Sequence, residues 1–233
     1  MSELLDFFAD NSSLLADKTL EHLAISAIGL AAALVLALPL GVVLGHFHRG
    51  SFVAISVSNG LRALPSLALI AISLAMFGLS ALNIQIALVA LAVPPILTNA
   101  FTAVDNVDPD AVEAANGMGM RFREVLLGVE IPLALPLIFA GIRTAAVYIV
   151  ATASLAGIGG GGGLGDIILN QPTYELAGVG AATILVVTLA FAANGLLALL
   201  QRALTPRALR ASGDVLAPVV TSEATAMERA GAT

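Results

Sequence analysis

The chain has 233 residues, of which 58% are hydrophobic and 11% charged, and its mean hydropathy is +0.98. Soluble domains carry roughly 25% charged residues, so a water-soluble fold is excluded and an integral membrane protein is predicted. The lack of cysteine excludes disulfides and thiol chemistry, and a net charge of −6 without a basic patch argues against nucleic-acid binding.

Residues 1–21 are acidic, and Lys18 is their one basic side chain. A secretory signal begins with positive charge instead. We therefore expect no cleaved leader, and we predict that this segment lies outside the cell.

Five apolar stretches follow, and a bilayer core of about 30 Å takes roughly 20 residues of helix to cross. Helices are predicted because a helix pairs its own backbone groups, and the alternating polarity of a barrel strand is missing. The fold class is therefore all-α. The stretches are 22–45, 51–78, 84–104, 133–158 and 176–200. They give a membrane domain over residues 22–203, followed by a tail, 204–233, whose end lacks any apolar period and is predicted to be disordered.

The second stretch is too long for one straight span and contains Gly60, Arg62 and Pro65. A break at 60–65 is predicted, because proline is tolerated in the first turn of a helix. Residues 51–61 would then lie at the membrane interface, and the span would run from about 64 to 78.

Basic residues predict the orientation, because cytoplasmic loops are enriched in Lys and Arg. They follow the first, third and fifth stretches, whereas the loops 79–83 and 159–175 have none. This places the N-terminus outside and the C-terminus in the cytoplasm after five crossings. The residues concerned are Arg49, Arg121, Arg123, Arg202, Arg207, Arg210 and Arg229.

The loop 105–132 is the one sizeable polar segment between spans. Asp108 followed by Pro109 is typical of a helix start, so a short helix over 109–116 is predicted, with Gly117 and Gly119 ending it. Residues 121–127 read as a second short amphipathic helix, which Pro132 would stop at the membrane edge. The small side chains of Ala111, Ala114 and Ala115 would share one surface of the first helix.

Within this loop, Glu113-Ala114-Ala115 is followed after three residues by Gly119, and after nine more by Val129, Ile131 and Pro132. The spacing resembles the EAA loop of the permease subunits of bacterial ABC importers. That resemblance implies a type I ABC importer permease architecture, in which this loop is a coupling helix docked on a cytoplasmic ATPase. The implied coupling residues are Glu113, Ala114, Ala115, Gly119, Met120, Arg121 and Pro132.

Further segments across about 20–203 resemble the osmoprotectant branch of these permeases, which imports glycine betaine, carnitine, choline or proline. They include 62–69, 107–109, 117–120, 132–136, 140–145 and 162–166. The resemblance implies two copies of an ATPase, a second permease that is identical or similar, and an exterior substrate-binding protein as partners. ATP and Mg²⁺ would bind the ATPase, because this chain has no Gly-x-x-x-x-Gly-Lys-Ser/Thr loop. It also has no nucleophile–base constellation, so it is predicted not to be an enzyme.

Arg143 lies about ten residues into the fourth stretch, where burial costs about 2.5–3.5 kcal/mol on insertion scales. Two interpretations remain open: the side chain snorkels to the cytoplasmic face, or it faces a wet pathway and meets the carboxylate of a zwitterionic solute. Arg62 presents the same choice. Candidate pathway residues are Arg62, Pro65, Ser66, Arg143 and Thr144.

The glycine run 159–163, continued by Gly165, is unfavourable in a helix at roughly 1 kcal/mol per residue. It is either a flexible exterior loop or a close-packed turn at the outer mouth, where Gly162, Gly163, Gly165 and Asp166 would form an outer gate. Asp166 could cap a short helix over 167–170. Pro39, Pro94 and Pro95 predict helix kinks or packing irregularities. His22, His46 and His48 lie at segment ends, and no metal site is expected from them.

Two alternatives to an osmoprotectant permease remain. The first is an ABC permease for methionine or another small solute. The second is an ion-coupled secondary carrier, which would require Asp or Glu buried within the spans, and the predicted spans contain none.

Overall fold

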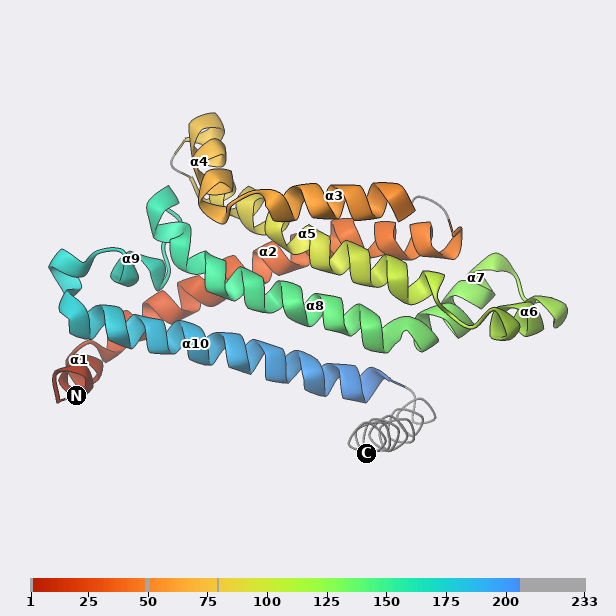
Figure 1. The fold of residues 1–233 in the computed structure, drawn as a ribbon. Coiled ribbons are helices and arrows are strands. Elements are labelled where there is room, and N and C mark those ends of the chain that lie inside the picture. The colour runs from red at the N-terminus through yellow and green to blue at the C-terminus, as the bar shows by residue number, and fades with distance from the viewer. Residues whose placement is uncertain (1, 49–50, 79, 206–233) are drawn as a thin grey trace, which may run out of the picture.

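The computed structural model describes residues 2–48, 51–78 and 80–205, and within these ranges it contains helices and no strands. Four long helices run side by side along the molecule (Figure 1). They are α2 (Ser12–His46), α5 (Ala81–Asp105), α8 (Ile131–Ala153) and α10 (Gln171–Leu204). The short α6 (Pro109–Gly117) and α7 (Phe122–Val125) project at one end, while α1 (Ser2–Asp10) and α9 (Gly165–Ile168) lie at the other (Figure 1).

These four helices correspond to four of the five predicted spans. Within the described ranges, they are the helices long and apolar enough to cross a membrane, α8 being counted together with the shorter segments at its two ends. The 35 residues of α2 extend over about 52 Å, so its charged start, with Lys18 and Glu21, precedes the apolar stretch 22–45.

The second predicted stretch is broken, as expected, into α3 (Ser51–Ala63) and α4 (Ser66–Phe77), with Pro65 directly before α4. Which half lies at the membrane interface stays a prediction. α3 runs along α5 in the bundle, where Thr98 donates a 2.8 Å hydrogen bond to Ser58, and α4 takes a different direction from α3 while it also packs on α5 (Figure 1). The 12 residues of α4 reach about 18 Å, which is shorter than a bilayer core of about 30 Å.

α2 packs tightly on α5 because small residues recur at every fourth position of α2, all on one face. A Cβ atom at Gly41 would lie 2.8 Å from the Ala100 Cβ, and one at Gly45 would lie 2.7 Å from the Phe101 carbonyl oxygen. Helices in a bilayer gain stability from such close approach rather than from hydrophobic exclusion of water. The buried small residues are Gly29, Ala33, Ala37, Gly41 and Gly45.

α5 is the central helix of the bundle, since α2, α3, α4 and α8 all pack against it. Its Pro94 and Pro95 are buried and the helix continues through them. The Asn99 side-chain amide donates to the Pro95 carbonyl oxygen at 2.7 Å. Gly141 of α8 fits against this point, where a Cβ atom would lie 2.6 Å from that same oxygen.

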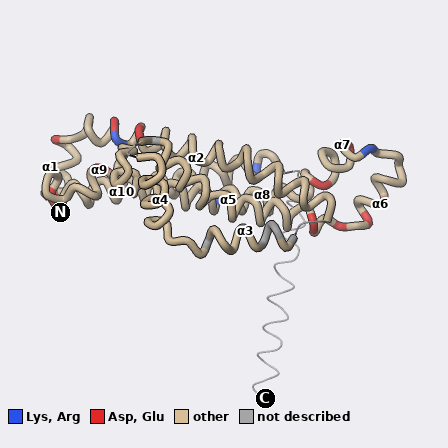
Figure 2. The backbone as a smooth tube through the Cα atoms, turned by 90° about the horizontal axis from the view of Figure 1, so that it is seen from above, with Lys and Arg blue, Asp and Glu red and all other residues tan. Residues whose placement is uncertain are grey.

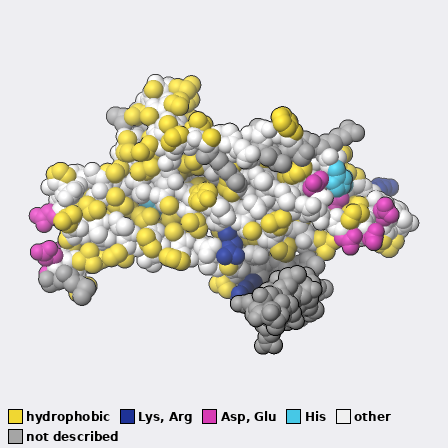
Figure 3. Space-filling view, in the orientation of Figure 1, with side chains coloured by type: hydrophobic (Ala, Val, Ile, Leu, Met, Phe, Trp, Pro, Cys, Tyr) yellow, Lys and Arg dark blue, Asp and Glu magenta, His cyan; other side chains and the backbone are white. Residues whose placement is uncertain are grey.

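The outer faces of the long helices are apolar, and hydrophobic side chains spread over much of the surface seen in Figure 3. Acidic side chains and histidine gather instead over the end formed by α6 and α7 (Figure 3). α10 counts as a possible membrane span because of an apolar stretch of 18 residues, and none of these residues is buried within the chain. This pattern is expected for a bundle whose outer surface contacts lipid or other membrane helices.

Candidate coupling loop, pathway hollow and glycine turn

The α6 helix begins as the sequence predicts. Asp108 is its N-cap, with Oδ1 accepting from the Asp110 N–H at 3.0 Å, and Pro109 follows at the first helical position. The helix stands at the end of the molecule, with acidic residues along it and basic residues near α7 (Figure 2). Its short length and exposed position make it a projecting element.

Gly119 closes the helix through a specific turn. The Gly119 N–H bonds the Asn116 carbonyl at 2.9 Å, and the Met120 N–H bonds the Ala115 carbonyl at 3.2 Å. This pair of bonds defines a Schellman motif, which needs a left-handed residue, and Gly119 has φ = +81°. The spacing between the alanines and the glycine is therefore the spacing that this turn requires.

The predicted coupling residues do not all face outward. Glu113, Ala114, Gly119 and Arg121 are exposed, and Met120 and Pro132 are intermediate. Ala115 is 1% exposed and packs into the chain itself, while Ala111 is intermediate. The three alanines share one side of α6 as predicted, but they are not equally exposed, and Ala115 anchors α6 to its own chain.

The predicted stop at Pro132 is also wrong. α7 continues through a π-helical segment, Leu126–Glu130, into α8, so that Pro132 lies in the first turn of α8. A proline ring clashes with the carbonyl four residues before it in a regular helix, and the wider π turn accommodates that clash. At the start of α7, the Arg121 N–H donates to Glu124 Oε2 at 2.6 Å.

A contact that sequence reasoning missed lies beside this π segment. His46 Nδ1 and Glu130 Oε2 are 2.6 Å apart, and their side chains are 15% and 4% exposed. Phe122 contacts both His46, at 4.5 Å between ring centroids, and Phe47, at 5.8 Å. Glu130 precedes the predicted start of the fourth span at 133, but the structure includes it in the same continuous helical run. The sequence feature that favours burial of Glu130 is its position between Val129 and Ile131, the two aliphatic residues of the motif.

Arg143 and Thr144 lie in one polar hollow of about 450 Å³ between α8 and α10, together with Tyr148 and Asn194. Arg143 Nε donates to Asn194 Oδ1 at 2.9 Å, and another guanidinium nitrogen lies 3.4 Å from Gln201 Oε1. Both acceptors are neutral amides, so the positive charge is hydrogen-bonded without being neutralised by them.

Pro65 and Ser66, also predicted as pathway residues, are not among the residues that line this hollow. Pro65 and Ser66 lie at the junction of α3 and α4, where Pro65 is exposed and Ser66 intermediate. Arg62 belongs to α3, and its side chain lies outside what is described, as do Arg49 and the tail after residue 205.

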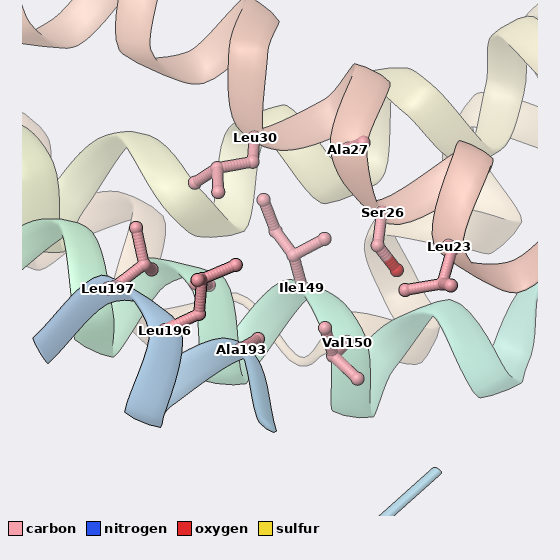
Figure 4. Close-up of a pocket in the computed structure, with 10 residues that line it drawn as sticks. Leu23, Ser26, Ala27, Leu30, Ile149, Val150, Ala193, Leu196 and Leu197 are labelled. Carbon is pink, nitrogen blue, oxygen red and sulfur yellow. The ribbon is translucent and has the colours of Figure 1, made fainter. Parts of the chain in front are cut away.

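A second cavity, of about 190 Å³, lies between α2, α8 and α10 (Figure 4). Its lining is almost wholly apolar, with Leu23, Leu30, Ile149 and Leu197 among its residues. Ser26, whose hydroxyl is buried without a hydrogen-bond partner, is its polar member. This lining does not suit a hydrophilic solute.

The glycine run is a close-packed turn, as one of the two interpretations proposed. Gly162 and Gly163 have φ of +82° and +78°, and Gly163 and Gly165 are buried. A Cβ atom at Gly165 would overlap the Ser154 carbonyl oxygen. The turn packs on α2, where a Cβ atom at Gly163 would lie 3.3 Å from His22 Nδ1.

Asp166 does not cap a helix, contrary to prediction. α9 has Leu164 at its N-cap and no side-chain cap, because Asp166 bonds Lys18 at 2.8 Å instead. Lys18 also bonds Glu21 at 2.8 Å, and Glu21 accepts from the Gly163 N–H at 2.9 Å. Hydrogen bonds to Asp166 and Glu21 raise the pKa of Lys18 above its usual range. This network joins the turn to the charged start of α2.

The three histidines form separate contacts. His22 is buried with Nε2 3.0 Å from the Val150 carbonyl oxygen, His46 meets Glu130, and His48 Nδ1 lies 2.8 Å from Asp105. Across the described residues, no group of three or more His, Cys, Asp or Glu side chains could hold a metal ion.

Comparison with known proteins shows which class of protein this chain belongs to. Residues 26–210 match the family of binding-protein-dependent transport system inner membrane components, and the chain belongs to that family. It is thus a multi-pass permease component of the inner membrane.

Particular relatives refine this class. The glycine betaine/carnitine/choline transport system permease protein OpuCB of Bacillus subtilis (strain 168) is 37% identical over 220 residues, covering 92% of this chain and 100% of that protein. The choline transport system permease protein OpuBB of the same organism is 37% identical, covering 90% and 97%. The osmoprotectant import permease protein OsmW of Salmonella typhimurium is 33% identical, covering 89% and 100%. The predicted resemblance to the osmoprotectant branch is confirmed.

The fold also matches a solved structure. A chain of the MetNI methionine ABC transporter in an inward-facing conformation aligns with a TM-score of 0.73 and 21% identity, covering 84% of this chain and 99% of that one. At this identity the likeness concerns the fold, and it confirms the predicted all-α importer permease architecture.

Proposed function

We propose that this chain is the membrane-spanning subunit of an ATP-driven importer for a compatible solute such as glycine betaine, choline, carnitine or proline. The observation that carries the proposal is the projecting α6 turn, in which Glu113 and Ala114 are exposed and Gly119 has φ = +81°. The relatives, which are named as permeases for glycine betaine, carnitine and choline, support the substrate class.

In this proposal α6 faces the cytoplasm and docks on an ATPase subunit, which holds ATP and Mg²⁺. The coupling residues are Glu113, Ala114, Ala115, Gly119, Met120, Arg121 and Pro132, with Ala115 and Pro132 acting inside the loop. Two ATPases and a second permease, identical or similar, complete the complex. The N-terminus and the glycine turn with Gly162, Gly163, Gly165 and Asp166 face the exterior, where a binding protein delivers the solute. ATP then biases a two-state equilibrium between inward and outward access.

Docking and orientation are tested with single cysteines, since the chain has none of its own. Glu113→Cys should cross-link to the ATPase in the assembled complex and resist an impermeant thiol reagent added to intact cells. A cysteine at Ser13, on the exposed start of α2, should behave in the opposite way. Labelling of Glu113→Cys from outside would contradict the proposed orientation.

The hollow between α8 and α10 supports a zwitterionic solute. The Arg143 guanidinium offers charge to a carboxylate, and the Tyr148 ring, 51% exposed, offers a face to a quaternary ammonium group. We infer that Arg143 and Thr144 line the pathway, with Arg62, Pro65 and Ser66 contributing from the α3–α4 junction.

Arg143→Gln tests this role in proteoliposomes that contain the whole complex. Loss of the charge should raise the KM for glycine betaine about tenfold, as expected for one charge-assisted hydrogen bond, and Arg143→Lys should recover part of it. Arg202→Gln, an exposed arginine at the end of α10, serves as the control. Unchanged kinetics in Arg143→Gln would remove Arg143 from the pathway.

The solute and the energy source are tested in the same vesicles. Excess glycine betaine should block uptake of labelled choline, whereas excess methionine should not, which separates the proposal from a methionine permease. Uptake should require ATP inside the vesicle and the ATPase subunit. Uptake by this chain alone, driven by an ion gradient, would establish a secondary carrier instead.

A further inference from the structure

The buried contact between His46 and Glu130 lies where α2 ends and the π segment enters α8. The carboxylate is 4% exposed and its bond to the imidazole is 2.6 Å long. In the described part of the chain, His46 is the one hydrogen-bond partner of the Glu130 side chain. Breaking a buried pair by removing one partner is costly because the other polar group is left unpaired.

The π segment connects the α6–α7 loop to the bundle. Residues 126–130 interrupt the regular hydrogen-bond ladder between α7 and α8, and such interruptions are common at functional sites. Leu126 of this segment is buried in an apolar cluster with residues of α2 and α5. Glu130 adds a directional hydrogen bond to that apolar contact, and the His46 and Phe47 rings pack against Phe122 of α7.

α2 packs closely enough on α5 for a movement of the π segment to reach α5. Its small residues pack directly on α5, so that Gly41 and Gly45 leave no room for a side chain between the helices. A displacement of the end of α2 is therefore transmitted to the centre of the bundle. The path runs from α7 through Glu130 and His46 to α2 and then to α5.

We propose that His46 and Glu130 are a positioning pair that transmits movement of the α6–α7 loop to α2 and α5. The inference rests on the proposed docking of an ATPase on α6. The directional bond fixes how the π turn is rotated against α2. Apolar contact alone would hold the two helices together without fixing that rotation.

The chain contains its own control. His48 and Asp105 form a second histidine–carboxylate contact at 2.8 Å, close in sequence to the first but with side chains 64% and 31% exposed. It joins the end of α2 to the end of α5 and does not involve α7 or the π segment. Replacing Asp105 therefore removes a histidine–carboxylate contact of the same chemistry while leaving the π segment untouched.

The test uses the assembled importer in proteoliposomes, with solute uptake and ATP hydrolysis measured together. Glu130→Leu should lower the solute transported per ATP about tenfold, the effect expected for loss of one hydrogen bond to a charged group. Glu130→Gln, which can still accept from the imidazole, should retain most of the coupling. Asp105→Leu should leave the ratio unchanged.

The double variant His46→Leu/Glu130→Leu decides between positioning and stability. Apolar replacement of both members of a buried pair is often neutral or stabilising, so this variant should unfold at the wild-type temperature and still couple as poorly as Glu130→Leu. Wild-type coupling in the double variant, or in a folded Glu130→Leu, would overturn the proposal. Absence of the Glu113→Cys cross-link in an otherwise wild-type complex would instead overturn the docking on which it rests.

Discussion

Gly119 and Gly165, at the two ends of the bundle, are required for opposite reasons. At the α6 end, Gly119 faces open space, where a Cβ atom would meet nothing within 4 Å, and is needed for its positive φ. At the other end, Gly165 is buried against the backbone at Ser154, and its φ is not in the left-handed region. One end projects a turn outward, and the other folds a turn onto the chain.

This difference indicates how each end can act. The α6 turn exposes Glu113, Ala114 and Gly119, so these residues are accessible to the surface of another protein. The glycine turn is linked to α2 through Gly163 and Lys18 and to α8 through Ser154, so it can move only if those helices move. A substitution in the α6 turn should therefore affect coupling to the ATPase, and a substitution in the glycine turn should affect folding of the chain.

The largest effect is expected from Gly165→Ala. Its methyl group would overlap the Ser154 carbonyl oxygen, which belongs to the backbone and cannot rotate away. Overpacking of this kind typically costs about 1–3 kcal/mol and occasionally more. Thermal unfolding of the purified chain in detergent should show a clear fall in midpoint. Gly195→Ala in α10, where a Cβ meets nothing within 4 Å, should not lower it.

A smaller effect, confined to coupling, is expected from Gly119→Ala. Holding a residue other than glycine in the left-handed region costs roughly 1–2 kcal/mol, so the turn after α6 would populate other conformations. ATP hydrolysis stimulated by the loaded binding protein should fall several-fold while the unfolding midpoint stays constant. Gly119→Asn should be milder, because asparagine tolerates positive φ.

The control for that experiment lies two residues earlier. Gly117 is helical and also has open space around its Cα, so Gly117→Ala should leave stimulation intact and favour the helix by about 1 kcal/mol. Equal losses in the two variants would mean that chain flexibility, rather than the left-handed conformation, is what the loop requires.

The preferences of short sequence segments were enough to predict the two ends of α6, the long helices and the break before α4. The Asp108–Pro109 start and the Gly119 end of α6 follow from capping and turn preferences within a few residues. The long helices follow from runs of apolar residues. The break before α4 follows from one proline.

Tertiary contacts explain what the sequence could not reveal. Pro132 does not end a helix, because the π turn absorbs its clash, and nothing in residues 126–130 marks that turn. α3 lies along α5, where it contacts residues far away in the sequence, such as Thr98, which bonds Ser58 from 40 positions away. Likewise, Glu130 and His46 are 84 positions apart, and their pairing depends on how α2 crosses α8.

The smallest effect is expected from Asp166→Asn, which removes one arm of the network that holds the glycine turn to α2. The Lys18 and Asp166 side chains are 20% and 34% exposed, and exposed ion pairs contribute about 0.2–1 kcal/mol. The variant should lose at most that much stability, and added salt should narrow its difference from the wild type. Asp17→Asn removes an equal charge from an exposed position nearby and should change little.

The same network predicts how stability depends on pH. The pKa of Lys18 is raised, so its contribution to stability is complete below the usual value of 10.5 and is lost only in strong alkali, as pH rises through the raised pKa. The pKa of Glu21 is lowered, so its contribution is present above the usual 4.5 and is lost as pH falls through the lowered pKa. Between those limits, the contributions of Lys18 and Glu21 should not vary with pH. A marked pH dependence there that persists in Asp166→Asn would mean that the turn is held by a group outside this network.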